Sequence, residues 1–489
     1  MRRRVLRTHR SHRGPRRQRA VALGVALALL AACGSRATDA QVVEALGTGN
    51  GTGANRTSGA TGTAAGANGG TDGAAGTGGV DGTGGGATGA GDAGANGAVL
   101  FVGDNGGATD VGVTGDSITV ANISILQGPV PGLFAGAPRG VQAYFAYQNS
   151  LGGVFGRQLK VDQQDDQFDC GINRALTEDD INKYFALVGS FSLFDGCGAV
   201  PLKEHPEMPD VHVPLDATAQ ALPNNFAVQP VKAGASTGPF QYIKDKHPNA
   251  ITKVGSLIGN VDTAKVAWEN AKYVMQSLGY QVVYERIFQP TETDFTADIV
   301  QMQSKGVQLL TLSSADVKTM ARVEAKANQQ SWHPEVTLLG AAGYDNTLFT
   351  LAGSNAALEN AYLYLPTSMY LGEDRADIPE VDLFQTWMQQ TNPGANVDLF
   401  TVYGWASAEM FVQALKAAGP QATRASLLGA LQQIDHFDGN GMLAPAGPAS
   451  KTPATCFIMV QVHGGKFERV DSPAGQFRCD ATYVYRPGA

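Results

Sequence analysis

Short apolar runs alternate with amphipathic stretches from about Thr114 to the end of the chain. The apolar runs are 118–126, 158–161, 186–189, 211–213, 253–258, 281–287, 308–312 and 336–339. Between them, apolar residues recur at helical spacing in 141–151, 172–185, 240–243, 263–278 and 298–303. Strand followed by helix, repeated this often, predicts an α/β fold with parallel sheets covered by helices. The runs form two series, so we expect two Rossmann-like lobes with a ligand cleft at the carboxyl ends of their strands.

The N-terminus has the pattern of an export signal. Eight arginines fall within the first seventeen residues, and an apolar run follows from Ala20 to Ala32. This run is too short to span a bilayer permanently. Leu30, Ala31 and Ala32 precede Cys33, which resembles the lipobox of bacterial lipoproteins. We therefore expect removal of 1–33 as a signal peptide with lipidation of Cys33, and a protein anchored to the outer face of the cell membrane.

Residues 34–113 are dominated by Gly, Ala, Thr, Asn and Asp, with almost no large apolar side chains before the final residues. Such a segment buries too little apolar surface to offset its ordering entropy, so we expect a disordered tether. The net charge is −8 with the basic signal included. No stripe of Lys and Arg with interleaved aromatic residues is present, which argues against nucleic-acid binding.

Four cysteines remain in the exported chain, and they allow three pairings that the sequence does not decide. We favour Cys170 with Cys197 and Cys456 with Cys479, because each pair closes a short loop worth about 3 kcal/mol. No C-x-x-C motif occurs, and no histidine lies at ligand spacing from a cysteine. We expect no metal and no cofactor.

Several segments of this region together resemble the type I periplasmic binding proteins, above all the leucine/isoleucine/valine receptors of ABC importers. They are 123–131, 140–148, 152–161, 186–192, 213–218 and 294–299. The resemblance implies two lobes joined by a three-crossover hinge that close over a small solute. It implies lobe 1 at 114–235 and about 362–445, and lobe 2 at 236–361 and about 446–489. It also implies a monomer without enzymatic activity, whose partners are a small-molecule solute and the permease subunits of an ABC transporter.

Polar residues at matching positions are the candidates for ligand binding. Backbone N–H groups at helix N-termini stabilise an anionic group, and hydroxyls orient the solute. The candidates are Gln127, Phe134, Ser192, Asp216, Thr218, Asp262, Ser314 and Tyr344. Each of them also fits an ordinary turn or helix-capping role, for which Ser192 and Asp262 are suitable residues.

Two departures from the amino-acid receptors bear on the solute. The resemblance places an acidic partner for the ligand ammonium where this chain has Ala342. Asp216 stands where the family has a small residue, and its carboxylate would repel an anion. We therefore expect a solute other than a simple branched-chain amino acid, such as an amide, a urea-like compound or an aromatic acid.

Two other functions are compatible with parts of the sequence. Gly234, Ser236 and Gly238 match the G-x-S-x-G motif of serine hydrolases, which requires a strand directly before the serine and a helix directly after it. The prolines at 230 and 239 favour a loop or helix-cap serine instead. A ligand-sensing lipoprotein without transport would use the same clamp, and the sequence does not separate it from an importer receptor.

Overall fold

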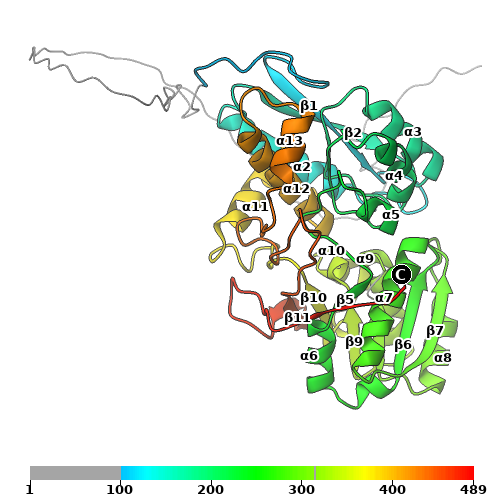
Figure 1. Cartoon of the computed structure of the whole chain (residues 1–489). Coiled ribbons are helices and arrows are strands. Elements are labelled where there is room, and N and C mark those ends of the chain that lie inside the picture. Colours follow the sequence, from blue (N-terminus) through cyan, green and yellow to red (C-terminus); the bar gives the residue numbers. More distant parts are fainter. Residues whose placement is uncertain (1–100, 313–314, 489) are drawn as a thin grey trace, which may run out of the picture. The chain divides into compact units, whose positions relative to one another are not determined.

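The computed structural model describes residues 101–312 and 315–488, and Figure 1 shows their helices and strands. The described chain contains a four-stranded sheet and a seven-stranded sheet, together with a separate two-stranded pair. The predicted signal peptide, Cys33 and residues 34–100 of the predicted tether lie outside the described residues. Among the described residues, no helix has both the length and the apolar character that crossing a bilayer requires.

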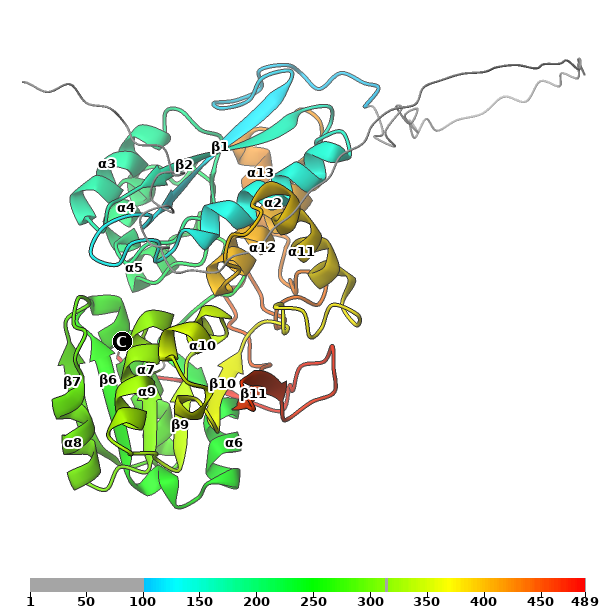
Figure 2. The ribbon, with the colours of Figure 1, turned by 180° about the vertical axis from the view of Figure 1, so that it is seen from behind.

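The first lobe is built on the four-stranded sheet, whose strands are all parallel and run in the order β2-β1-β3-β4. These strands are β1 (Ser117–Ser124), β2 (Gln158–Asp165), β3 (Leu187–Val188) and β4 (Asp210–Val211). The helices of this part are α2 (Gly136–Ser150), α3 (Cys170–Asp180), α4 (Asp195–Glu204), α5 (Ala217–Gln220), α11 (Pro379–Thr391), α12 (Leu399–Ala418) and α13 (Arg424–Leu431). Figure 2 shows α11, α12 and α13 gathered beside α2.

Helix α12 is buried nearly all round and packs against α2. The two backbones approach closely because glycines lie at the contact. A Cβ on Gly140 would stand 2.1 Å from the carbonyl oxygen of Thr401, and one on Gly404 would stand 2.0 Å from that of Ala137. These two positions therefore hold the late helix α12 against the early helix α2.

The second lobe contains the seven-stranded sheet, in the order β12-β11-β10-β9-β8-β6-β7. Its strands are β6 (Val254–Gly259), β7 (Val282–Phe288), β8 (Leu309–Leu312), β9 (Val336–Leu339), β10 (Ala361–Leu365), β11 (Ile458–His463) and β12 (Lys466–Arg469). Its helices are α6 (Gly238–Lys246), α7 (Asp262–Ser277), α8 (Thr296–Ser304), α9 (Val317–Gln329) and α10 (Thr347–Ala352), with short 3-10 turns at η2 (Ala250–Thr252), η3 (Ala341–Gly343) and η4 (Asn355–Ala357). The first five strands are parallel, whereas β11 and β12 form an antiparallel hairpin. The remaining pair joins β5 (Gly234–Ser236) to β13 (Tyr483–Tyr485).

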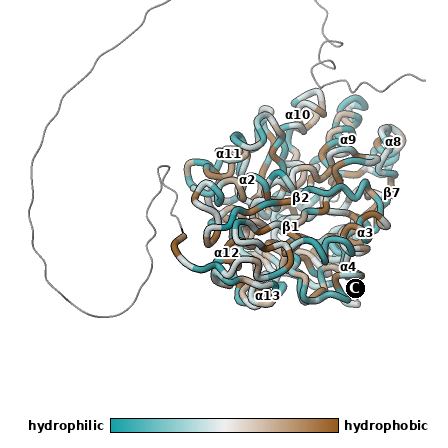
Figure 3. Tube along the Cα trace, turned by 90° about the horizontal axis from the view of Figure 1, so that it is seen from above, coloured by the Kyte–Doolittle hydropathy of each residue, from teal (hydrophilic) through white to brown (hydrophobic). Residues whose placement is uncertain are grey.

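The chain passes three times between the two sheets, after β4, after β10 and again before β11. The predicted alternation of strands and helices is confirmed, and so is the parallel arrangement of both series. Hydrophobic and hydrophilic stretches interchange along the part of the trace that faces the viewer in Figure 3. The residue bounds assigned to the two lobes stay a prediction, although β10 pairs with β9 and thus extends the seven-stranded sheet to Leu365.

Both predicted disulfides are present. Cys170 and Cys197 join α3 to the first turn of α4, with their Cα atoms 5.6 Å apart. Cys456 and Cys479 join the residue before β11 to the C-terminal tail, with their Cα atoms 4.1 Å apart. The first bond therefore braces the loops at the carboxyl end of the four-stranded sheet, and the second fixes the tail.

Residues 101–113 were predicted as the last part of the tether, and the structure corrects this boundary. The buried guanidinium of Arg157 donates hydrogen bonds to the carbonyl oxygens of Asn105, Gly107 (2.9 Å) and Thr114 (2.7 Å). Phe101 also packs edge-on against Phe155. One buried arginine satisfies several backbone carbonyls at once, so this segment belongs to the folded part.

Candidate functional site

Loops that follow strands of both sheets surround one pocket of about 570 Å³, which we call the interlobe pocket. Open parallel sheets bind ligands at this end of their strands. The four-stranded lobe contributes Pro129, Phe168, Leu193, Phe194, Gly196, Cys197, Asp216 and Thr218 to the lining. The other lobe contributes Asn260, Val261, Asp262, Thr263, Gln289, Pro290 and Thr291. A pocket of this size accommodates a small organic molecule.

Asp195, in the first turn of α4, fixes the loop that carries Asp216. Its buried carboxylate accepts hydrogen bonds from the backbone N–H groups of Leu215 and Asp216, the latter at 3.0 Å. Asp216 in turn caps α5, because its Oδ1 accepts from the N–H of Thr218 at 2.8 Å. The Asp216 carboxylate lies directly over Gly196, where a Cβ would stand 2.5 Å from its Cγ. Asp216 is thus held at the N-terminus of α4.

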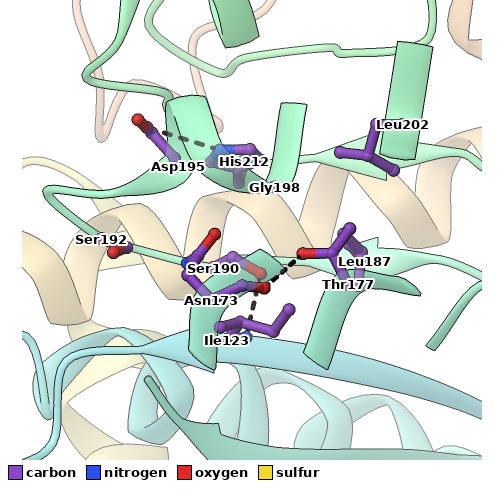
Figure 4. Close-up of a pocket in the computed structure, with 10 residues that line it drawn as sticks. All are labelled: Ile123, Asn173, Thr177, Leu187, Ser190, Ser192, Asp195, Gly198, Leu202 and His212. Atoms are coloured by element: carbon purple, nitrogen blue, oxygen red, sulfur yellow. Dashed lines mark hydrogen bonds and ion pairs between the residues drawn. The ribbon is translucent and has the colours of Figure 1, made fainter. Parts of the chain in front are cut away.

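The buried side chain of His212 lies next to Asp195, as Figure 4 shows. His212 Nδ1 lies 2.5 Å from Asp210 Oδ1, and its Nε2 lies 3.9 Å from Asp195 Oδ2. Burial lowers the pKa of His212, but the two aspartates outweigh this and raise it to about 10. A protonated His212 therefore lies between two carboxylates, and it neutralises part of the negative charge behind the pocket wall.

The position of Phe168 in the wall of the interlobe pocket depends on an unusual backbone conformation. Gln167 and Phe168 both have positive φ angles, 55° and 63°, a conformation that is costly for residues other than glycine. Asp166 stabilises it by accepting from the N–H of Phe168 at 3.1 Å. Phe168 then meets Phe194 edge to face, with ring centroids 5.2 Å apart. Burial raises the pKa of Asp166, whereas its hydrogen bonds to Ser192 and Asn173 oppose that shift.

The second lobe contributes the start of α7. Asp262 is in the first turn of this helix, with a side chain 94% exposed and its Oδ1 3.1 Å from Lys265 Nζ. The helix N-cap is Val261, so Asp262 is not the capping residue that the sequence suggested. The N–H of Asn260 donates to the carbonyl of Phe288 at 2.7 Å, which ties together the loops after β6 and β7.

Three of the predicted residues line the interlobe pocket together: Asp216, Thr218 and Asp262. Their contact with a solute stays a prediction. Gln127 is exposed outside the lining, and its backbone N–H donates to Asp165 at 3.2 Å. Ser314 lies outside the described residues.

The other predicted side chains are turned into the protein. Ser192 lines a separate cavity of about 20 Å³ (Figure 4), donates to Asp166 and accepts from the N–H of Phe194 at 2.9 Å. Phe134 packs against Phe191 with ring centroids 4.8 Å apart. Tyr344 is fully buried, and its hydroxyl donates to Glu373. Ligand contact by these three residues also stays a prediction.

Sequence reasoning missed most of the aromatic and amide lining. The missed residues lie in loops that each follow a parallel strand; they are Phe168, Phe194, Asn260 and Gln289. The bounds of β2, β6 and β7 would have indicated Phe168, Asn260 and Gln289, since the carboxyl ends of parallel strands share one edge. The left-handed backbone that turns Phe168 into the pocket had no signal in the sequence.

The serine of the G-x-S-x-G motif has the local context that the motif requires. Ser236 ends strand β5, and α6 begins at Gly238, so the expectation of a loop or cap serine is wrong. However, its hydroxyl donates to the carbonyl of Thr455 at 3.2 Å and accepts from the N–H of Gly238 at 3.4 Å. Among the described residues, no histidine is hydrogen-bonded to Ser236. Within 101–312 and 315–488, His, Cys, Asp and Glu side chains also form no group that would hold a metal ion.

Known proteins share this architecture. Residues 117–466 match the family model described as periplasmic binding protein. A fatty acid ABC transporter substrate-binding protein from Thermomonospora curvata is 19% identical, with a TM-score of 0.61 over 77% of this chain and 93% of that one. A branched chain amino acid ABC transporter from Thermus thermophilus with bound valine is 17% identical, with a TM-score of 0.62 over 73% and 96%.

A third solved structure is an ABC transporter solute binding protein from R. palustris in complex with benzoate. It is 17% identical, with a TM-score of 0.60 over 76% of this chain and 98% of that one. No curated protein sequence matches the chain. At such low sequence identities, these three comparisons show that this chain shares the fold of the solved structures.

Proposed function

This chain belongs to the periplasmic binding protein family and has the type I fold, and we propose that it is an extracytoplasmic receptor that captures a small solute for an ABC permease. The observation that carries this proposal is the interlobe pocket, since loops from both sheets line it. A solute bound there would touch both lobes, so that closing the lobes would expel water and strengthen its hydrogen bonds. Capturing and releasing a solute in this way requires no catalytic side chain in the pocket.

The solute we propose is a small polar or amino-acid-like metabolite other than leucine, isoleucine or valine. Relatives with this fold bind valine in one case and benzoate in another, so the fold accepts several classes. In this chain Ala342, in the short turn η3, stands where the resemblance to the amino-acid receptors implies an acidic residue. Titration of the purified protein with the three amino acids should give no heat at micromolar concentrations, and micromolar binding of any of them would refute this part.

Direct identification of the solute provides the main test of the function. The purified protein is denatured, and the released small molecules are identified by mass spectrometry. A receptor should release a stoichiometric metabolite that binds again to refolded protein. Release of nothing, together with no binding from a metabolite extract, would contradict a receptor function.

We also propose that the protein is exported and anchored through a lipid on Cys33. The two disulfides support an oxidising compartment, because such bonds persist in exported proteins. Cys33→Ser should move the protein from the membrane fraction to the soluble fraction, and it should abolish incorporation of a labelled fatty acid. Unchanged membrane association of this variant would argue against the anchor.

A further inference from the structure

The charged side chains of the interlobe pocket are all of one sign. Asp216 on one lobe and Asp262 on the other both line it. Among the described lining residues there is no Lys, Arg or His. Lys265 pairs with Asp262 at 3.1 Å, and Lys318 donates to the carbonyl of Pro131, which follows the lining residue Pro129, at 3.1 Å. Neither is part of the lining, so a solute in the pocket faces carboxylates.

Two helices begin at the pocket, and their N-termini would ordinarily favour an anion. Each such end carries about half a positive charge. At α4 the protein supplies its own anions, since Asp195 is in the first turn and Asp216 lies over Gly196. At α7, Asp262 is in the first turn. A carboxylate of the protein therefore already opposes the half charge at each helix end, so neither end offers an uncompensated positive charge to a solute carboxylate.

The Asp216 carboxylate keeps one oxygen available for a solute. Its Oδ1 accepts from the N–H and the hydroxyl of Thr218. Among the described residues, no donor is hydrogen-bonded to Oδ2. Asp262 is paired only with the neighbouring lysine on the helix surface, and exposed pairs of this kind are weak and easily replaced. Both carboxylates are therefore able to pair with a cation brought by the solute.

The rest of the lining suits the same kind of solute. The rings of Phe168 and Phe194 meet edge to face at the pocket wall. Aromatic faces attract cationic nitrogens, and carboxylates beside aromatic rings are a common way to bind amines. Apolar contacts for a hydrocarbon part come from Pro129, Leu193, Val261 and Pro290.

Resting on the proposed function, we infer that the interlobe pocket selects solutes that carry a cationic nitrogen on an apolar skeleton, and that it rejects carboxylates. Asp216 and Asp262 bind the cation, and the rings of Phe168 and Phe194 contact both the cationic nitrogen and the adjoining skeleton. Among the solutes considered from the sequence, this excludes aromatic acids, and it admits an amide or a urea-like compound only where the solute also carries a cationic nitrogen. It also explains why an acidic residue stands at position 216.

Four probes with the same benzyl skeleton test this selection: phenethylamine, phenylacetamide, phenylalanine and phenylacetate. Binding to the full chain, freed of retained cargo, is measured by calorimetry and by thermal shift at pH 7.5 and low salt. Phenethylamine should bind at least tenfold more tightly than phenylacetate. Its affinity should fall as the salt concentration rises, because salt screens the charge on the pocket.

Substitutions assign the effect to the pocket carboxylates. Asp216→Asn keeps an oxygen that accepts from Thr218, so it should weaken phenethylamine about tenfold and change phenylacetamide less than twofold. The matched control is Asp294→Asn, because Asp294 is also an aspartate that accepts hydrogen bonds from a threonine at the start of a helix but lies outside the pocket lining. This control should leave all four affinities unchanged.

The outcomes separate the solute class from the function itself. Tighter binding of phenylacetate or phenylalanine than of phenethylamine would overturn the inference and leave the receptor function intact. Equal loss of amine and amide binding in Asp216→Asn would also overturn it. If no probe binds, the charge of the metabolite released on denaturation decides: a cationic amine supports the inference and a carboxylate refutes it. If no metabolite is released, the charge of the one that binds from a metabolite extract decides in the same way. If none binds from the extract either, the proposed function fails, and the inference fails with it.

Discussion

Replacing Gly140 with alanine should destabilise the first lobe strongly, because α2 and α12 touch at this residue. The added Cβ would lie 2.1 Å from the carbonyl oxygen of Thr401 and 2.6 Å from the backbone N of Trp405. Both atoms belong to the backbone of a buried helix, so no side chain can rotate away. The helices would have to separate by about 1 Å, and overpacking of this kind costs about 1–3 kcal/mol. We expect the upper end, about 3 kcal/mol.

Gly429→Ala is the matched control, since Gly429 is in helix α13 and a Cβ there would meet nothing within 4 Å. Alanine in an open helix position stabilises by about 0.5–1 kcal/mol relative to glycine. The two variants, with the same chemical change, should therefore differ by roughly 4 kcal/mol. Urea unfolding followed by circular dichroism and tryptophan fluorescence measures both. A Gly140→Ala protein that unfolds at the urea concentration of the unsubstituted protein would refute the close contact of α2 with α12.

Three further predictions concern the pocket wall and two buried groups. Replacing both Cys170 and Cys197 with serine should lower the free energy of unfolding in urea by about 3 kcal/mol. It should also weaken solute binding, because Cys197 lines the pocket. Replacing both cysteines of the other disulfide should leave binding unchanged. The aspartates beside His212 outweigh its burial and raise its pKa to about 10, so its contribution to stability is full below about pH 6.5 and is lost as the pH rises through 10. Unfolding between pH 6 and 10.5 should show this fall, and an equal fall in His212→Gln would contradict it. Burial raises the pKa of Glu324 to about 8, so ionisation of this carboxyl destabilises the fold at high pH. Glu324→Gln should therefore be more stable than the parent protein at pH 9 but not at pH 4.5.

The sequence predicted the strands well wherever an apolar run was bounded by polar residues or glycine. Runs 253–258 and 336–339 correspond to β6 (Val254–Gly259) and β9 (Val336–Leu339). The turn between β11 and β12 depends on glycine, since Gly464 and Gly465 have positive φ angles of 57° and 75°. Helix α12 was not identified, because a helix that is buried on every side shows little amphipathic periodicity.

The candidate site was predicted only in part. Asp216, Thr218 and Asp262 line one pocket, and their contact with a solute stays a prediction. The direction of each side chain was not predictable, because it depends on partners far away in the chain. Ser192 turns inward because its hydroxyl donates a hydrogen bond to Asp166, which lies in the loop after a different strand.

What the sequence by itself determined was the local pattern: the order of strands and helices, and the spacing of cysteines that favours two short loops. These follow from periodicity, turn residues and loop length, which act over a few residues to a few tens of residues. Only the tertiary structure decided which loops share a pocket and which charges face it. Asp216 reaches the N-terminus of α4 because Gly196 leaves room for it and Asp195 holds its backbone, and these contacts exist only once the sheet has formed.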